Sequence, residues 1–264
     1  MRVYLINLER RKDRLQAMEE QAARLGLGLE RVVALDAGTA DRDEVNSRFA
    51  QWFAESGPLG EIPAGDKACL LSHRAAWERF ASSRDAHAVF LEDDVRLSKA
   101  AGPMLASDAW IPPGADVVKL EHYGPPGQRV LLADLHAAAN GFQIGRMLSR
   151  HTGGAAYILS RKAAGLLLAE TCYDLAVDHL LFNPNNSKLF ARLSPWQLCP
   201  AIARQEEFVG EKSDIEKTRA GLRRFGWTYV RRELVRFGYD LKLLPRQIAA
   251  LIGGAKFVAM TTAP

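Results

Sequence analysis

Short apolar runs alternate with amphipathic segments through the first part of the chain. The opening run RVYLINL (2–8) has the apolar composition of a buried strand. The next segment repeats apolar residues every three or four positions, which predicts an amphipathic helix ending near Gly26 and Gly28. A second strand is predicted over 29–35. This strand–helix–strand order is typical of α/β proteins with a mixed, mostly parallel sheet.

The alternation continues beyond the first fifty residues. The further predicted elements are a helix over about 42–55, a helix over 67–80, strands over 89–95, 115–123 and 153–160, and a helix over 161–171 capped by Ser160. Residues 99–114 read as a linker, and 129–149 have no clean period. We expect an irregular excursion with a hairpin there.

Charge is distributed unevenly along the chain. The sequence has 35 Lys and Arg against 31 Asp and Glu, a net charge of +4. Residues 217–264 contain ten basic residues and two acidic ones, so residues 1–216 carry a net charge of −4. The basic character belongs to the C-terminal segment, which argues against a nucleic-acid-binding core.

The C-terminal segment has the pattern of a basic amphipathic helix. Its apolar residues at helical spacing are Val230, Leu234, Phe237, Leu241, Leu244 and Ile248. Pro245 should kink or interrupt this helix. Such a helix can lie on an anionic membrane, or it can pack on the body or on a partner subunit. We expect a catalytic domain over 1–214 and a basic helical tail over 215–264 that binds an anionic membrane surface.

Composition excludes several classes of protein. A hydrophobic fraction of 48% and a charged fraction of 25% are ordinary for a globular protein. No run approaches 18 uninterrupted apolar residues, and the first strand-like run is not a signal peptide, so a cytoplasmic location is expected. The isolated cysteines Cys69, Cys172 and Cys199 match neither a zinc motif nor a disulfide framework. There is no GxxxxGK or GxGxxG motif.

The strand predicted over 89–95 ends in three consecutive carboxylates, Glu92, Asp93 and Asp94. Ligands of open α/β sheets bind at the carboxyl ends of the strands. Adjacent acids repel one another unless a cation lies between them. Such oxygen ligands suit Mg²⁺ or Mn²⁺ holding phosphate oxygens. The alternative is a solvated strand end.

Eight segments, in order over about residues 1–207, resemble glycosyltransferase family 25, the lipooligosaccharide and lipopolysaccharide sugar transferases. They are VYLINLERRKDR (3–14), ALDA (34–37), ACLLSHRAAW (68–77), VFLEDDV (89–95), VVKLE (117–121), TGGAAYILSRKAA (152–164), VDHLLF (177–182) and CPAIARQ (199–205). The chain departs from the family pattern in two ways. Its acidic triplet begins with Glu rather than Asp, and residues 124–150 match none of the family segments.

The resemblance implies a GT-A-like, single Rossmann-type domain with a helical C-terminal appendage. It also implies inverting, Mn²⁺- or Mg²⁺-dependent transfer of a hexose, galactose or glucose, from a UDP-sugar to a saccharide acceptor. The acceptor would be a lipid-linked bacterial lipooligosaccharide, with the enzyme peripheral on the inner face of the cytoplasmic membrane. A metal-dependent phosphoesterase or nucleotidyltransferase, or an inactive nucleotide-sugar-binding module, would also explain acids at a strand edge.

Within the resemblance, the metal ligands are Asp94 first and Glu92 second. Glu92 or Asp93 would otherwise contact the ribose or support the metal ligands. At the end of the first strand, Asn7 and Leu8 are assigned to the donor, with the Asn7 amide reading a uracil edge.

Three more residues belong to the predicted donor site. Arg14 stands where the family pattern has an arginine, and it would contact the diphosphate. Asp36 would accept a hydrogen bond from a ribose hydroxyl, or would only initiate a turn. His73 would donate to a phosphate, or would be a buried histidine that orients the acidic loop.

An inverting reaction needs a general base within hydrogen-bond reach of the acceptor hydroxyl. Asp178 in VDHLLF is the first candidate, and its alternative role is to cap the following helix. Glu121, at the end of its predicted strand, is assigned to sugar binding or to the base role.

Overall fold

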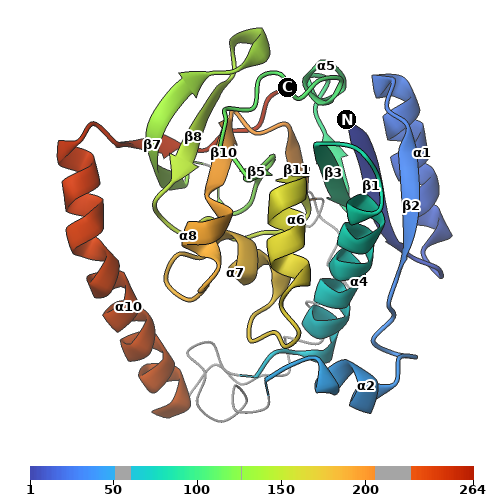
Figure 1. The fold of residues 1–264 in the computed structure, drawn as a ribbon, viewed down its shortest axis with the longest axis horizontal. Helices are drawn as coiled ribbons and strands as arrows, with labels where there is room; N and C mark the ends of the chain where they lie inside the picture. The colour runs from blue at the N-terminus through green and yellow to red at the C-terminus, as the bar shows by residue number, and fades with distance from the viewer. Residues whose placement is uncertain (51–60, 126, 206–226) are drawn as a thin grey trace.

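The computed structural model describes residues 1–50, 61–125, 127–205 and 227–264 (Figure 1). Nine strands form one large sheet in the order β12 (Lys256–Ala259), β7 (Arg129–Ala137), β8 (Gln143–Met147), β10 (Pro195–Cys199), β5 (Val117–Lys119), β9 (Ala156–Ser160), β3 (His87–Glu92), β1 (Arg2–Leu8) and β2 (Leu29–Ala34). Six of these strands, β2, β1, β3, β5, β10 and β7, run in one direction, and β9, β8 and β12 run in the other. The predicted α/β class with a mixed, mostly parallel sheet is therefore confirmed.

Helices cover both faces of this sheet. The described helices are α1 (Lys12–Leu25), α2 (Arg42–Ser47), α4 (Ala64–Ala81), α5 (Ala101–Leu105), α6 (Arg161–Leu168), α7 (Val177–Phe182), α8 (Phe190–Leu193), α10 (Trp227–Ile252) and the short 3₁₀ helix η1 (Ala139–Gly141). The α4, α6 and α7 helices share one hydrophobic cluster, and α1 and α5 share the other.

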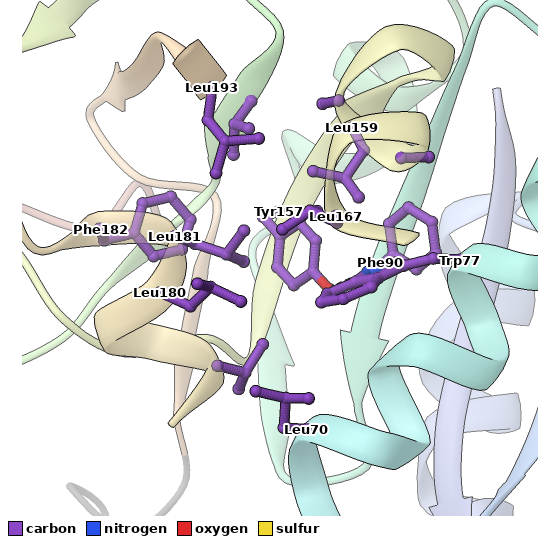
Figure 2. Packing of buried hydrophobic residues seen from close by; sticks show 14 of the residues in the cluster. Leu70, Trp77, Phe90, Tyr157, Leu159, Leu167, Leu180, Leu181, Phe182 and Leu193 are labelled. Carbon is purple, nitrogen blue, oxygen red and sulfur yellow. Dashed lines mark hydrogen bonds between the residues drawn. The ribbon is translucent and has the colours of Figure 1, made fainter. Parts of the chain in front are cut away.

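The central strands β1, β3 and β9 are largely apolar because successive side chains enter different clusters. In β3, Phe90 packs with Trp77 and Tyr157 in the cluster under α4 and α6 (Figure 2), whereas Val89 and Leu91 pack on the other face. The rings of Phe90 and Tyr157 stack with their centroids 5.3 Å apart. Both faces of the central strands are therefore buried.

Two predicted helix boundaries agree with the structure. The α1 helix ends at Gly26, whose φ of 68° is the left-handed conformation that glycine adopts without strain. At the start of α6, the Ser160 hydroxyl accepts a hydrogen bond from the Ala163 N–H at 3.1 Å, as predicted for a cap.

Several other predictions were wrong in detail. The strand predicted over 115–123 breaks at Leu120, so that β5 stays in the main sheet. The next two residues, β6 (Glu121–His122), join a three-stranded sheet with β4 (Val95–Leu97) and β11 (Ala203–Gln205).

The irregular hairpin expected over 129–149 is confirmed: β7 and β8 pair antiparallel, with a register shift between Ala133 and His136. Two other segments differ from their predicted outlines. The expected linker over 99–114 contains α5. The helix predicted over 42–55 ends as α2 at Ser47, and residues 51–60 lie outside the described residues.

The C-terminal segment contains α10, which continues through Pro245 without interruption. After α10 the chain returns to the body, because β12 pairs antiparallel with β7 at the edge of the main sheet. The boundary predicted at residue 214 lies outside the described residues. Among the helices that the structure describes, none combines the length and apolar character needed to cross a membrane.

Candidate functional site

A cavity of about 410 Å³ lies where the parallel strands β1, β2 and β3 end. Their carboxyl ends meet at one edge of the sheet, where open α/β sheets bind ligands. Of the predicted site residues, the cavity wall contains Leu8, Arg14, Asp36, Glu92, Asp93 and Asp94. Arg10, Arg42 and Cys69 also line it. The structure therefore brings most of the predicted donor and metal residues together.

Negative charge is concentrated on one wall of this cavity. One carboxylate oxygen of Asp94, Oδ1, is buried and has no hydrogen-bond partner among the described residues. Burial and the neighbouring Glu92 raise the pKa of Asp94 well above its usual range. Burial, together with Glu121 and Asp93, raises the pKa of Glu92 to about 8. Burial thus disfavours the charged form of both carboxyl groups, and a bound cation would offset that cost.

Asp93 is already held by protein groups. The Arg14 guanidinium donates from Nη1 to Asp93 Oδ1 at 3.0 Å, and the Asn7 amide donates from Nδ2 to Oδ2 at 2.7 Å. The Asn7 amide oxygen accepts a hydrogen bond from Arg31 Nε at 3.1 Å. Asn7 is buried and is absent from the cavity wall, and its contact with a uracil edge stays a prediction. In the structure its amide fixes Asp93.

Asp36 combines the two roles considered for it. Its Oδ1 accepts a hydrogen bond from the Gly38 N–H at 2.9 Å, which closes a turn, and its Oδ2 pairs with Arg10 Nε at 2.6 Å. The Gly38 N–H and Arg10 lower the pKa of Asp36. The carboxylate is ionised and faces the cavity, where it can accept further hydrogen bonds.

His73 is fully buried and orients Glu92 rather than facing the cavity. Its Nδ1 lies 2.7 Å from the Tyr157 hydroxyl, and its Nε2 lies 3.1 Å from Glu92 Oε1. Because Trp77 Nε1 donates to the Tyr157 hydroxyl at 2.9 Å, that hydroxyl is free to donate to Nδ1. His73 then donates from Nε2 to Glu92. Burial lowers the pKa of His73 to about 3, so the ring is neutral. These contacts match the second of the two roles considered, a buried histidine that orients the acidic loop, and donation to a phosphate stays a prediction.

Cys69 was not predicted to belong to the site. It lies one helical turn before His73 on α4, and its Sγ is 3.8 Å from Glu92 Oε1. Burial and the charge of Glu92 raise the pKa of the Cys69 thiol well above its usual range. The i, i+4 spacing of Cys69 and His73 is the sequence signal that could have identified this cluster.

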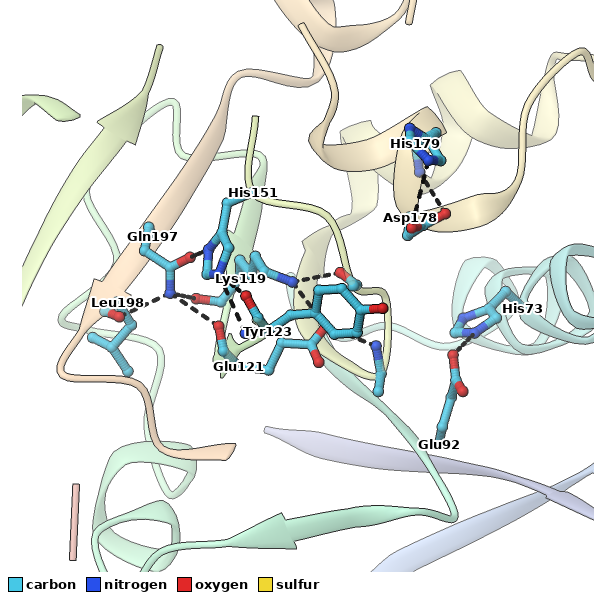
Figure 3. A network of polar contacts seen from close by, with 12 residues as sticks. His73, Glu92, Lys119, Glu121, Tyr123, His151, Asp178, His179, Gln197 and Leu198 are labelled. Atoms are coloured by element: carbon cyan, nitrogen blue, oxygen red, sulfur yellow. Dashed lines mark hydrogen bonds and ion pairs between the residues drawn. The ribbon is translucent and has the colours of Figure 1, made fainter. Parts of the chain in front are cut away.

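A second polar network lies beside the first and is centred on a buried ion pair (Figure 3). Lys119 and Glu121 are both fully buried, with Lys119 Nζ at 2.8 Å from Glu121 Oε1. Lys119 also donates to the Gly153 carbonyl oxygen, and Glu121 Oε1 accepts from the Ala155 N–H at 2.9 Å. Glu121 is not among the residues that line the cavity, and its sugar-binding or base role stays a prediction.

His151 and Gln197 extend this network beneath the ion pair. The Gln197 amide nitrogen donates to the carbonyl oxygens of Lys119, Glu121 and Leu198, which fixes the amide so that Oε1 faces His151 Nδ1 at 2.7 Å. Burial, aided by Lys119, lowers the pKa of His151 to about 3. A neutral His151 donates from Nδ1. A lysine inside the apolar run VVKLE was the sequence signal for this network.

Asp178 lies at the start of α7, next to the glycine pair of TGG. A Cβ placed on Gly154 would lie 3.6 Å from the Cα and Cβ atoms of Asp178. The helix N-cap is Ala176, so Asp178 is not the predicted cap; its Oδ1 accepts from the His179 N–H at 2.8 Å. Its side chain is partly exposed, and its charge contributes to the raised pKa of Glu92.

The glycine pair connects Asp178 with the buried network. Gly153 has a φ of 94°, and a Cβ there would lie 2.6 Å from Tyr123 Cβ and 3.0 Å from Glu121 Oε1. Only glycine fits this combination of backbone conformation and close approach. The Lys119–Glu121 pair thus supports one side of the turn, and Asp178 contacts the other.

Comparisons with known proteins find similarity to one class of protein, the glycosyltransferases of lipooligosaccharide and lipopolysaccharide biosynthesis. The family model "Glycosyltransferase family 25 (LPS biosynthesis protein)" matches residues 1–181. The chain is similar to the lipooligosaccharide biosynthesis protein lic2B of Haemophilus influenzae, at 27% identity over 55% of this chain and 56% of that protein. It is 32% identical to the lacto-N-neotetraose biosynthesis glycosyltransferase LgtB of Neisseria meningitidis over 53% of each chain. For LgtE of the same species the identity is 28% over 76% of this chain and 74% of that one. The chain thus spans little more than half the length of the first two relatives.

Proposed function

Because the chain belongs to glycosyltransferase family 25, we propose that it transfers a hexose, galactose or glucose, from a UDP-sugar to a saccharide acceptor of lipooligosaccharide or lipopolysaccharide. The supporting observation is the cavity at the carboxyl ends of β1, β2 and β3, which has acids on one wall and arginines beside them. A nucleoside diphosphate carries the negative charge that a cation and guanidinium groups stabilise there.

The oxygen ligands that Asp94 and Glu92 offer suit Mn²⁺ or Mg²⁺. Asp94 would hold the ion through its unpartnered buried oxygen, with Glu92 as the second ligand. A bound divalent ion would supply charge neutralisation for the leaving diphosphate. His73 fixes the Glu92 carboxyl from behind, and Asn7 and Arg14 fix Asp93, so the protein orients the acids in advance.

The remaining donor contacts follow from the cavity wall. The ionised Asp36 accepts a hydrogen bond from a ribose hydroxyl, and Leu8 provides an apolar contact at the end of β1. Arg14 donates to the diphosphate while its Nη1 stays bonded to Asp93. A planar guanidinium with five N–H donors can serve both partners.

Asp178 is the general base of the proposed reaction. Its side chain is partly exposed beside Gly154, whereas Glu121 is enclosed by Lys119 and Ala155. Asp178 would take the proton of the acceptor hydroxyl as that oxygen attacks the anomeric carbon and the UDP oxygen leaves. One displacement inverts the anomeric configuration. Glu121 and Lys119 only position the Gly153–Gly154 turn.

The test of the donor and metal assignments is release of UDP from a panel of UDP-sugars, with Mn²⁺ and with EDTA. We expect metal-dependent hydrolysis of one donor, and its loss in Asp94→Asn. The control Asp134→Asn changes an exposed acid on β7 and should behave as wild type. Turnover of Asp94→Asn equal to wild type would refute the metal site. Hydrolysis of simple phosphoesters would favour the phosphoesterase, and metal-dependent UDP binding without turnover would favour the inactive module.

The test of the base uses an acceptor saccharide and the kinetics of two matched acid-to-amide variants. Asp178→Asn should lower kcat by about 10²–10⁴-fold with little change in donor binding. Glu121→Gln should change stability more than kcat. A retained anomeric configuration in the product, seen by NMR, would contradict a single displacement by the acceptor hydroxyl with Asp178 as its base.

We also propose that α10 attaches the enzyme to an anionic membrane surface. The apolar residues Leu234, Phe237, Leu241, Leu244 and Ile248 are exposed, and they repeat at intervals of three and four. Arg246 is exposed on another face of the same helix. This combination is typical of interfacial helices.

Point substitutions test the membrane proposal better than truncation does, because truncation would also remove β12 from the sheet. Phe237→Gln combined with Leu241→Gln should weaken binding to vesicles containing anionic lipid. The same substitutions should leave the unfolding curve unchanged, since both side chains are exposed. Unchanged vesicle binding would refute attachment through α10.

A further inference from the structure

Three side chains of different chemistry converge on the acidic wall of the donor cavity. Cys69 and His73 lie one turn apart on α4, and Glu92 reaches them from the end of β3. The Cys69 Sγ and Glu92 Oε1 atoms are 3.8 Å apart, and His73 Nε2 is 3.1 Å from the same oxygen. All three potential ligand atoms lie within 4.8 Å of one another. We propose that Cys69, His73 and Glu92 form a zinc site.

Two of the three separations between these atoms, sulfur to oxygen and nitrogen to oxygen, are close to those of tetrahedral zinc. With Zn–S of about 2.3 Å and Zn–N and Zn–O of about 2.0–2.1 Å, tetrahedral angles separate sulfur from oxygen by about 3.6 Å and nitrogen from oxygen by about 3.4 Å. The distances in the protein, 3.8 and 3.1 Å, differ from these values by only about 0.2–0.3 Å. Small rotations of the Cys69 and Glu92 side chains would close that difference.

The His73 ring is already oriented for such a role. A zinc-bound histidine almost always has a hydrogen-bond partner on its other nitrogen. For His73 that partner is the Tyr157 hydroxyl, 2.7 Å from Nδ1. A hydroxyl oxygen has two acceptor positions, so Tyr157 can accept from Trp77 Nε1 and from His73 Nδ1 together. The ring can therefore carry its proton on Nδ1 and bind the ion through Nε2.

The ligand set decides which ion binds. Sulfur, imidazole and one carboxylate favour Zn²⁺ over Mn²⁺ or Mg²⁺, which prefer oxygen ligands. On binding, the thiol proton of Cys69 and the carboxyl proton of Glu92 leave to solvent, and His73 binds as a neutral ligand. Cys69 and Glu92 line the cavity, so an ion can enter from there. Zinc would thereby occupy Glu92, the second ligand of the proposed Mn²⁺ site.

The test is a titration of the metal-free full chain with Co²⁺, which replaces zinc and reports a thiolate ligand. We expect a sulfur-to-cobalt charge-transfer band in the near ultraviolet, saturating at one equivalent and removed by Zn²⁺. Cys69→Ser should abolish the band, and the matched control Cys172→Ser, at an exposed thiol, should retain it. Absence of the band, or its persistence in Cys69→Ser, would overturn the proposal.

Two further variants separate this site from its surroundings. Asp94→Asn should keep the cobalt band, because Asp94 is not among the three ligands. Loss of the band there would refute the three-ligand site, since it would show that the ion also needs Asp94. Tyr157→Phe should lower zinc affinity by about 10–100-fold, measured by competition with a coloured chelator, since it removes the partner of Nδ1. Unchanged affinity would refute the assignment of His73 as a ligand. If Cys69→Ser does not fold, as judged by circular dichroism, Glu92→Gln replaces it and should weaken cobalt binding at least tenfold. These readouts do not depend on glycosyl transfer.

Discussion

Replacing Lys119 by methionine should destabilise the protein by about 3–5 kcal/mol, the cost of breaking a buried ion pair by removing one partner. The ammonium group is fully buried, 2.8 Å from Glu121 Oε1 and 4.5 Å from the centroid of the Phe182 ring. Methionine would keep much of the aliphatic packing. It would leave the Glu121 carboxylate without its charge partner, and the Gly153 carbonyl without its donor.

The burial of Glu121 makes this loss severe. Its second oxygen, Oε2, is buried without a partner among the described residues, so it cannot compensate for loss of the lysine. Removing both charges should cost much less than removing one, because neutral groups need no counter-charge. We therefore expect Lys119→Met combined with Glu121→Gln to recover at least about 2 kcal/mol of the loss. The glutamine oxygen can still accept from the Ala155 N–H.

The assay is urea denaturation followed by circular dichroism and tryptophan fluorescence. In Lys119→Met, burial opposes the ionisation of Glu121, which has lost its counter-charge. The stability deficit should then shrink as the pH falls from 8 to 5, where the carboxyl is protonated at little cost. A deficit under about 1 kcal/mol at pH 8, or no recovery in the double variant, would refute the ion-pair argument.

Two other predictions follow from the same region. Gly153→Ala should lower the free energy of unfolding by at least about 1–3 kcal/mol, because alanine is strained at a φ of 94° and would also approach Tyr123. The control Gly165→Ala in α6 has open space around it and should raise the free energy of unfolding by about 0.5–1 kcal/mol, both measured by thermal unfolding. His73 and His151 have a pKa of about 3 against about 6.5 in the unfolded chain, so stability should fall as the pH drops from 6.5 toward 3. His151→Gln should reduce that slope by about 1.4 kcal/mol per pH unit, and an unchanged slope would contradict a neutral His151.

The sequence predicted those strands whose partners are uniform along their length. Residues 2–8 and 29–34 form β1 and β2 almost as predicted, because the two strands pair with each other in one register along their length, and β1 pairs with β3 in the same way. In β1 five consecutive residues are buried, which is the source of its apolar pattern. The prediction of one continuous strand over 115–123 was wrong, because the strand breaks at Leu120. There the Leu120 N–H still donates to the Ala156 carbonyl oxygen of β9, but the Leu120 carbonyl oxygen accepts from the N–H groups of Ile202 and Ala203. This second pairing comes from residues distant in sequence. The local pattern of apolar and polar residues cannot predict such a change of pairing partner.

The candidate site shows the same limit at the level of side chains. Carboxylates at the end of an apolar strand could be predicted to share a cavity, since strand direction alone places them at the sheet edge. The roles of Asn7 and His73 could not be predicted in this way. Asn7 bonds to Asp93 and His73 bonds to Tyr157, and in each pair the two residues lie more than 80 positions apart on different elements. Polar residues in buried segments are satisfied by whatever the tertiary fold brings near them.

The position of β12 at the edge of the main sheet has a consequence for synthesis of the protein. Lys256 pairs with Leu132, more than a hundred residues earlier. During translation at about 5–20 residues per second, the hairpin of β7 and β8 leaves the ribosome well before its outer neighbour exists. Until then β7 has an unpaired edge of backbone N–H and C=O groups that can pair with another chain. The nascent protein is therefore most prone to aggregation in the seconds before residues 256–259 emerge, when a chaperone that covers this edge would help it most.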